Sequence, residues 1–219
     1  MIEVSECCLR LERPVQGNDT PYLREVFGRE FEEHVLQHNR GPEGEPVYEY
    51  PRVQFKVHES TALLLGVMEG SQLLKQLWEE FDEGQLDNAR MSVKGTSFET
   101  REEQLDSTSE PLKYRFLTPW LALNEKNFRA YTGSRNQKFR KDELSRILVG
   151  NCLGMAKSLG ICFSERITAD CSKLTSIKTT VGGKGMIGFI GRFQINLRIP
   201  EHLGLGKSVA RGLGMVAEG

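Results

Sequence analysis

The sequence predicts an α+β protein, and three observations support this prediction. Stretches that alternate apolar and polar residues, as half-buried strands do, recur along the chain, and VQFKVH at 53–58 is the clearest. Between them lie stretches with apolar residues every three or four positions, the spacing of amphipathic helices. Apolar residues make up 38% of the 219 residues and charged residues 27%, as in ordinary globular proteins.

The first half contains six predicted elements in the order strand, helix, strand, strand, helix, strand. A strand over 2–14 ends at Pro14, and a helix over 20–42 begins with Thr20 as its N-cap and Pro21 at its first position. Apolar patterning predicts the remaining elements: strands over 50–58, 61–70 and 89–100, and a helix over 71–81. This order is that of the ferredoxin-like split βαβ arrangement, and it predicts a first domain over residues 1–104.

The second half is predicted to form a separate domain over residues 111–219. The polar stretch 101–111 predicts a linker, and a strand interrupted at Pro119 follows it. An amphipathic helix is predicted over 141–160, with Gly160 just after its end. Two or three strands follow, and the stretch 188–200 alternates so that one face carries Arg192, Gln194, Asn196 and Arg198.

Charge is divided unequally between the two halves. Residues 1–110 contain 11 Lys and Arg against 23 Asp and Glu, a net charge of −12. Residues 111–219 contain 18 against 7, a net charge of +11. Such an asymmetry predicts that the second half binds a polyanion such as nucleic acid. The alternative is two solvated surfaces that attract each other.

Several functional classes are excluded by what the sequence lacks. No apolar run approaches the length of a membrane span, and the first residues lack the pattern of a signal peptide, so we expect a cytoplasmic protein without membrane partners. The five cysteines form no CxxC pair, which favours free thiols over a zinc site or a disulfide framework. No cofactor and no bound metal are predicted.

The glycine-rich end, EHLGLGKSVARGLGMVAEG, does not match a nucleotide-binding loop. A P-loop requires glycine at position 201, which is Glu201. The stretch GGKGMIG at 182–188 fits GxGxxG, but it is followed by a predicted strand where a dinucleotide site requires a helix. We therefore expect neither kind of nucleotide site.

Four segments in order resemble a known family. LREVFGREFEEHVLQHNR, YEYPRVQFKV, LLLGVMEGSQLL and the closing LGLGKSVARGLGMV resemble the CRISPR repeat-RNA processing endoribonucleases, the Cas-six family of the RAMP superfamily. The most specific mark is the closing loop of form GxGxxxxxGxG, with Gly204, Gly206, Gly212 and Gly214. The resemblance implies two tandem ferredoxin-like (RRM-like) βαββαβ domains, binding of a CRISPR repeat transcript, and metal-independent cleavage to a cyclic phosphate.

The resemblance also indicates catalytic candidates. His38 matches the family's histidine at the end of the first helix, and a histidine near a helix C-terminus suits a general acid. The alternative is that His38 only caps its helix. Lys56 matches the family's lysine after the tyrosine–proline strand and suits contact with the transition-state phosphate, against the alternative of a solvated strand face. His34 lies one helical turn before His38, and the general base is left open between His34, Tyr48 and water.

A metal site is not predicted, because HVLQH lacks the glutamate of HExxH and no third ligand is evident. His58 and His202 are interpreted as ordinary surface residues, and Trp78 and Trp120 as core residues. The loop glycines would let backbone amides approach phosphates, and cations would add charge. The expected RNA contacts are Arg192, Arg198, Gly204, Gly206, Lys207, Arg211, Gly212 and Gly214.

Three hypotheses therefore stand. The first is a repeat-RNA endoribonuclease whose partner is CRISPR repeat RNA, with a homodimer implied by the resemblance. The second is a non-catalytic RNA-binding subunit of a CRISPR effector complex. The third is an interaction protein whose acidic half docks a basic partner; the absence of salt-dependent RNA binding would favour it.

Overall fold

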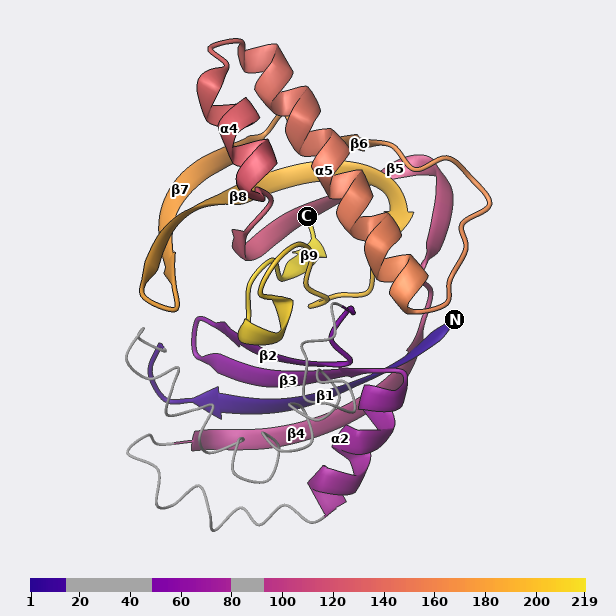
Figure 1. The fold of residues 1–219 in the computed structure, drawn as a ribbon. Coiled ribbons are helices and arrows are strands. Elements are labelled where there is room, and N and C mark those ends of the chain that lie inside the picture. The colour runs from indigo at the N-terminus through magenta and orange to yellow at the C-terminus, as the bar shows by residue number, and fades with distance from the viewer. Residues whose placement is uncertain (15–48, 80–92) are drawn as a thin grey trace, which may run out of the picture. The chain divides into compact units, whose positions relative to one another are not determined.

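The computed structural model of the protein describes residues 1–14, 49–79 and 93–219 (Figure 1). The predicted α+β class is confirmed, because the described residues form helices together with two antiparallel sheets. None of the helices in these ranges has the length and apolar character needed to cross a membrane. The chain divides into two compact units: unit 1 is Met1–Glu103 with Ala210–Gly212, and unit 2 is Gln104–Val209 with Leu213–Gly219.

Unit 1 is built on a four-stranded sheet of order β2-β3-β1-β4, in which all neighbours are antiparallel. The elements are β1 (Ile2–Leu11), β2 (Val53–His58), β3 (Thr61–Val67), α2 (Glu69–Glu79) and β4 (Val93–Glu103). The four strands and the second helix predicted for this half are confirmed in their described parts. The helix predicted over 20–42 lies outside the described residues.

One face of this sheet packs against α2. The core there consists of alternate residues of the strands with the inner side of the helix: Cys7, Leu9, Leu11, Val53, Phe55, Ala62, Leu64, Leu74 and Leu77. Two glycines allow the helix to start close to the sheet, since a Cβ on Gly66 would lie 2.4 Å from the Gly70 carbonyl oxygen. The hydroxyls of Ser5 and Ser71, 2.6 Å apart, hydrogen-bond β1 to the first turn of α2.

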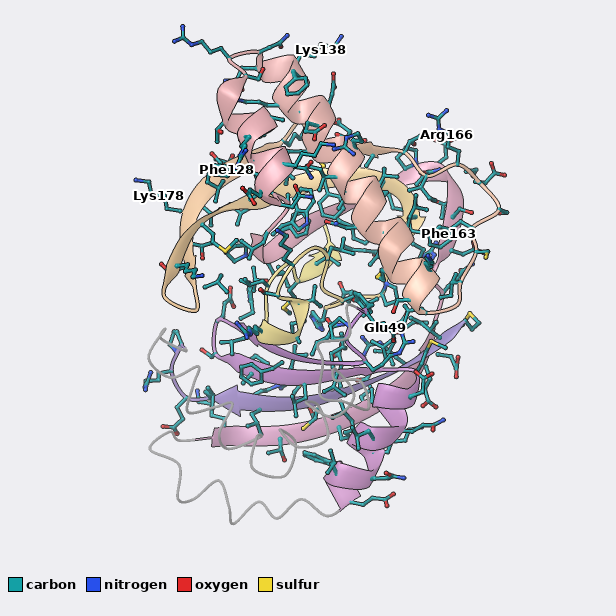
Figure 2. The ribbon with its side chains drawn as sticks, viewed as in Figure 1. Glu49, Phe128, Lys138, Phe163, Arg166 and Lys178 are labelled. Atoms are coloured by element: carbon teal, nitrogen blue, oxygen red, sulfur yellow. The ribbon has the colours of Figure 1, made fainter. Side chains whose placement is uncertain are left out.

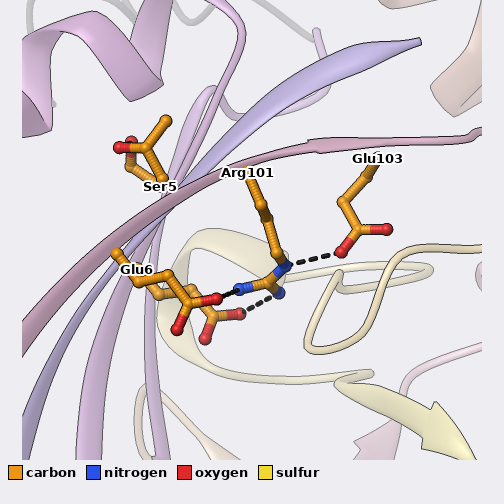
Figure 3. Close-up of polar contacts among 6 residues, drawn as sticks. Ser5, Glu6, Arg101 and Glu103 are labelled. Atoms are coloured by element: carbon orange, nitrogen blue, oxygen red, sulfur yellow. Dashed lines mark hydrogen bonds and ion pairs between the residues drawn. The ribbon is translucent and has the colours of Figure 1, made fainter.

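The opposite face carries an ion-pair network centred on Arg101 (Figure 3). Its guanidinium donates from Nη2 to Glu6 Oε1 at 2.7 Å and from Nε to Glu103 Oε1 at 2.5 Å, and Nη1 lies 3.4 Å from Glu99 Oε1. Three carboxylates of the acidic half therefore share one cation. Elsewhere in the unit Lys75 pairs with Glu3 at 2.9 Å, so part of the negative charge of this half is compensated internally.

Unit 2 contains a five-stranded sheet of order β6-β8-β5-β9, with β7 also paired to β8. Its strands are β5 (Asp106–Trp120), β6 (Ala169–Asp170), β7 (Leu174–Val181), β8 (Lys184–Arg198) and β9 (Val216–Glu218). Its helices are α4 (Glu125–Gly133), α5 (Gln137–Ser158) and the 3-10 turn η1 (Val209–Arg211). The last two residues of η1 are grouped with unit 1.

Helix α5 lies across the sheet of unit 2 (Figure 1) and buries its apolar side there. The Trp120 indole donates from Nε1 to Asn151 Oδ1 at 3.0 Å, which links the end of β5 to the middle of the helix. Aromatic rings fill the space beneath α5, with Phe116 stacked on Trp120 at a centroid distance of 5.2 Å. Trp120 is confirmed as a core residue, and Gly160 follows the helix with φ +69, as predicted.

Two expectations for the second half are wrong. The predicted linker over 101–111 belongs to β4 and β5, and only Gln104 and Leu105 lie between the two strands. The interruption predicted at Pro119 is seen in the pairing with β8, which shifts register between Phe116 and Trp120, although β5 itself continues to Trp120. Between β8 and β9, a stretch that is fully described, the second helix of a βαββαβ domain is replaced by η1 and the glycine-rich loop. Low hydrophobicity suggested the linker, but residues paired in a long sheet can be polar on their exposed side.

The five cysteines are all free thiols, as predicted. Cys7, Cys152 and Cys171 are buried, and burial raises the pKa of Cys7 and of Cys171 to about 12. Cys162 differs, because it is exposed. Buried thiols of this kind contribute to packing and are poor nucleophiles.

Candidate nucleic-acid interface

Three of the four predicted catalytic residues, His34, His38 and Tyr48, lie outside the described residues. The fourth, Lys56, lies in the middle of β2 opposite Leu63 of β3. Its side chain shares a strand face with Gln54 and His58, as the alternation predicted.

Lys56 is fully buried, with 0% of its surface exposed, and so is Gln54. The alternative of a solvated strand face is therefore wrong for these two residues. Alternation shows which side chains share a face, but it does not show whether other parts of the protein cover that face. Burial disfavours the charged ammonium and lowers the pKa of Lys56 from 10.5 to about 7.

We expect this pKa shift to appear as a pH dependence of stability. Between pH 7 and pH 10.5 the folded protein holds Lys56 neutral while the unfolded chain binds a proton, so the free energy of unfolding rises with pH in this window. The substitution Lys56→Met removes that contribution. Between pH 7 and pH 10.5 the unfolding free energy of the wild type should therefore increase, relative to that of Lys56→Met, by about 1.4 kcal/mol for each pH unit.

Urea denaturation at several pH values measures this difference. The control is Lys94→Met, which removes an exposed lysine from β4 of the same unit. Parallel curves for wild type and Lys56→Met would show that Lys56 keeps its ordinary pKa in the folded protein.

The predicted glycine loop closes on itself and is hydrogen-bonded to β5. Leu205 N donates to Gly214 O at 2.9 Å, and Gly204 forms an isolated bridge with Met215. On the side of β5, Gly214 N donates to Pro119 O at 3.0 Å. Several amides of the loop are therefore used to join it to β5 and to close it on itself.

Glycine is required in this loop for close packing. A Cβ on Gly214 would lie 1.9 Å from the Leu205 carbonyl oxygen, and one on Gly206 would lie 2.6 Å from Trp120 Nε1. Both residues also have positive φ values, +67 and +90, which favour glycine. Gly212, with φ +94, lies in the part of the loop grouped with unit 1, where its Cβ would lie 3.1 Å from the Phe55 carbonyl oxygen.

The two cations of the loop are exposed. Lys207 is positioned by two hydrogen bonds to the chain after β5, from its backbone N to Leu121 O at 3.3 Å and from Nζ to Leu123 O at 3.0 Å. Arg211 lies at the end of η1. The loop thus presents two positive charges on a backbone that packing holds in place.

A second group of cations lies on the sheet of unit 2. Arg192 and Arg198 are exposed on β8, on the side opposite the buried Phe193 and Ile195, as predicted. The pairing of β5 with β8 adds two cations that the sequence analysis did not select: Lys113 lies opposite Gln194, and Arg115 lies opposite Arg192. The alternation of KYRF at 113–116 was the signal that could have identified them.

Two of these cations, Lys113 and Arg192, line a pocket of about 240 Å³. Cations and an amide dominate its lining, which consists of Lys113, Asp170, Lys173, Arg192, Phe193, Gln194 and Gly219. Asn196, on the same strand face, is used structurally, since its Oδ1 accepts from Thr168 N at 2.6 Å. A pocket with three cations and one carboxylate suits a phosphate or another anion.

Within residues 1–14, 49–79 and 93–219, no group of three or more His, Cys, Asp or Glu residues is arranged to hold a metal ion. The exposed cations of the β5–β8 face and of the glycine loop suit the binding of an anion.

Comparison with known proteins identifies the family. The Cas6b N-terminal domain matches residues 1–104, and the Cas6b C-terminal domain matches residues 106–219. A solved Cas6b structure shares 29% identity and a TM-score of 0.86, and a solved CRISPR RNA processing endoribonuclease Cas6b shares 28% and 0.79; both comparisons cover 100% of each chain. An uncharacterized protein of Methanocaldococcus jannaschii, MJ0978, is 37% identical over 114 residues, which are 52% of this chain and 77% of the relative. The resemblance drawn from the sequence is confirmed, and the chain belongs to the Cas6b family.

Proposed function

We propose that this protein is a CRISPR RNA processing endoribonuclease that binds repeat RNA in precursor transcripts and cuts it once per repeat. The observation that supports this most is the match of both Cas6b domains, which together span nearly the whole chain. A solved relative that covers this chain fully is a CRISPR RNA processing endoribonuclease. The cationic face of unit 2 supports the same proposal, because an RNA partner requires such a surface.

The proposed reaction uses no metal. The 2′-oxygen next to the scissile phosphate attacks phosphorus, the bond from phosphorus to the 5′-oxygen breaks, and a 2′,3′-cyclic phosphate forms. His38 is the proposed general acid, which gives its proton to the leaving 5′-oxygen. His34, Tyr48 or water takes the proton of the 2′-hydroxyl.

Lys56 remains in the proposed site, but its side chain must become exposed before it can contact RNA. A fully buried amine cannot reach an RNA phosphate, so a role in stabilising the transition state requires its exposure when RNA binds. A loss of more than about 100-fold in cleavage by Lys56→Met, with RNA affinity kept, would support direct contact.

For RNA binding we propose two surfaces, the β5–β8 face and the glycine loop. The β5–β8 face would bind phosphates through Arg192 and Arg198, with Lys113 and Arg115 beside them. The glycine loop would contribute Lys207 and Arg211, while Gly206, Gly212 and Gly214 allow its close-packed backbone and Gly204 pairs with Met215.

We further propose that both units descend from the ferredoxin-like plan, in domains over 1–104 and 111–219. Unit 1 has the order β2-β3-β1-β4, and unit 2 has the corresponding order β6-β8-β5-β9. In this interpretation the glycine loop with η1 replaces the second helix of the second domain. We also propose that the protein acts in the cytoplasm, forms a homodimer and associates with a CRISPR effector complex.

The loop cations supply a direct test of the binding surface. The double substitution Lys207→Ala and Arg211→Ala should weaken repeat-RNA binding and lower the slope of log affinity against log salt by about 1.4, because two phosphate contacts are lost. Fluorescence anisotropy over a range of salt concentrations measures the slope. The control is Lys94→Ala with Lys157→Ala, which removes the same charge from exposed positions elsewhere. An unchanged slope would remove the loop from the RNA interface.

The proposed function is tested by incubating the protein with the repeat RNA of its own genome in EDTA. One cut per repeat that leaves a 2′,3′-cyclic phosphate is the expected result. A strict metal requirement would refute the mechanism. Retention of the RNA on a gel without any cut would favour the hypothesis of a non-catalytic RNA-binding subunit. The acidic N-terminal half also favours that hypothesis.

A further inference from the structure

The helical hairpin formed by α4 and the start of α5 is the most concentrated basic segment that the structure describes in unit 2. Residues 124–141 contain six Lys and Arg against one acidic residue, Glu125. Four of these cations are exposed and form no ion pair with any other described residue: Lys126, Arg135, Lys138 and Lys141. The hairpin lies at the end of unit 2 where Lys138 projects outward (Figure 2).

The hairpin also exposes aromatic rings. Phe128 on α4 is 45% exposed and Phe139 on α5 is 41% exposed. Every other aromatic side chain in the described ranges is buried or half-buried, so both exposed rings of that part of the chain lie on this one hairpin. Exposed aromatics grouped among cations mark an interaction surface.

The hairpin is held rigidly enough to present these rings. Tyr131 of α4 packs edge-on against Phe189 of β8, with ring centroids 5.4 Å apart. Arg140 joins the two helices, since its Nε donates to Tyr131 O at 3.0 Å and its guanidinium lies 5.2 Å from the Tyr131 ring centroid. Phe128 and Phe139 are left out of these contacts.

The helix starts themselves are not available to an anion. Asn124 Oδ1 accepts from Asn127 N at 2.8 Å, and Asn136 Oδ1 accepts from Lys138 N and Phe139 N at 2.9 and 3.2 Å. These caps satisfy amides of the first turns. Any ligand of the hairpin is therefore bound by side chains, that is, by cations and phenyl rings.

We propose that the α4–α5 hairpin binds a single-stranded segment of RNA, with unpaired bases stacked on Phe128 and Phe139 and phosphates bound by Lys126, Arg135, Lys138 and Lys141. Phenyl rings among cations match the two features of a single strand, a base with an exposed face and a charged backbone. A duplex offers only the second feature, since its bases are already stacked. This inference rests on the proposed function for the presence of RNA, and it adds a site outside the β5–β8 face and the glycine loop.

The test uses the full-length protein and a fluorescein-labelled uridine oligomer about 16 nucleotides long, with an RNA duplex of equal length beside it. The variant Phe128→Ala with Phe139→Ala should bind the oligomer about tenfold or more weakly, with duplex affinity unchanged. The matched control is Leu153→Ala, which removes an apolar side chain that is 48% exposed on the same helix. We expect the control to bind as the wild type does.

A second pair of variants tests the charges. Lys138→Gln with Lys141→Gln should lower the salt slope for the oligomer by about 1.4. Lys94→Gln with Lys157→Gln, which removes the same charge outside the hairpin, should leave the slope unchanged. Because all these side chains are exposed, circular dichroism melting should show the same stability for each variant.

Wild-type affinity for the oligomer in the phenylalanine variant would overturn the proposal. The proposal would also be overturned if sedimentation velocity showed a dimer for the wild type and a monomer for the phenylalanine variant, with equal RNA affinity. The two rings would then contact a second copy of the chain. Cleavage is measured separately on repeat RNA. If the hairpin variants bind the uridine oligomer more weakly but the wild type does not cleave repeat RNA, only the nuclease function is refuted. If the wild type cleaves repeat RNA but the hairpin variants bind the oligomer as well as it does, only this inference is refuted.

Discussion

Replacing His38 by alanine is expected to slow cleavage of repeat RNA by about 10²–10⁴-fold, the usual contribution of a general acid. RNA affinity should change by less than about twofold, because the side chain acts on the leaving oxygen and not on the phosphate charges that dominate binding. Single-turnover cleavage at saturating protein measures the first quantity, and anisotropy with labelled repeat RNA measures the second.

The control for this prediction is His58→Ala, which removes a histidine of β2 to which we assign no role. It should cleave at close to the wild-type rate. Retained cleavage in His38→Ala would transfer the general-acid role to another residue, with His34 the first to be tested. Loss of both binding and cleavage would show instead that His38 supports the fold or the RNA interface.

The second large effect is expected at Gly214. An alanine there would place its Cβ 1.9 Å from the Leu205 carbonyl oxygen, at a backbone φ of +67 that costs a side chain about 1 kcal/mol. Relief of the clash requires the Leu205–Gly214 and Gly214–Pro119 hydrogen bonds to open. We expect Gly214→Ala to lower the free energy of unfolding of unit 2 by roughly 3 kcal/mol in total.

A matched control separates the clash from the backbone strain. Gly183, in the turn between β7 and β8, has φ +76, and a Cβ there would meet nothing within 4 Å. Gly183→Ala should therefore cost only about 1 kcal/mol. Urea denaturation followed by Trp120 fluorescence, in a Trp78→Phe background, reports on unit 2. Equal destabilisation by the two variants would show that packing against Leu205 is not what requires glycine at 214.

The glycine loop has a packing role that the sequence analysis did not consider. The sequence analysis selected Gly204, Gly206, Gly212 and Gly214 because glycine lets backbone amides approach phosphate. In the structure, Gly206 packs on Trp120 and Gly214 on Leu205, and several loop amides bond to β5 or within the loop. No local pattern indicates such contacts, because residues 119–121 are far from the loop along the chain.

Only two of the four cations named on the β5–β8 face of unit 2 were predicted from the sequence, for a similar reason. Arg192 and Arg198 follow from the alternation of a single strand. Lys113 and Arg115 join them through the register of β5 with β8, since their paired residues, Gln194 and Arg192, lie 81 and 77 positions further along the chain. The hairpin over 124–141 was not predicted as a unit either, although Asn124 and Asn136 are good N-cap residues.

The sequence by itself determined the α+β class, the four described strands of unit 1, helices α2 and α5, and the family, because these depend on local periodicity and on ordered motifs. Only the tertiary structure decided that Lys56 is buried, that residues 101–103 and 106–111 are strand, and that Gly206 packs against Trp120. The physical reason is the same in each case. Periodicity states which side chains lie on one face, whereas burial, register and close approach depend on what distant parts of the chain place against that face.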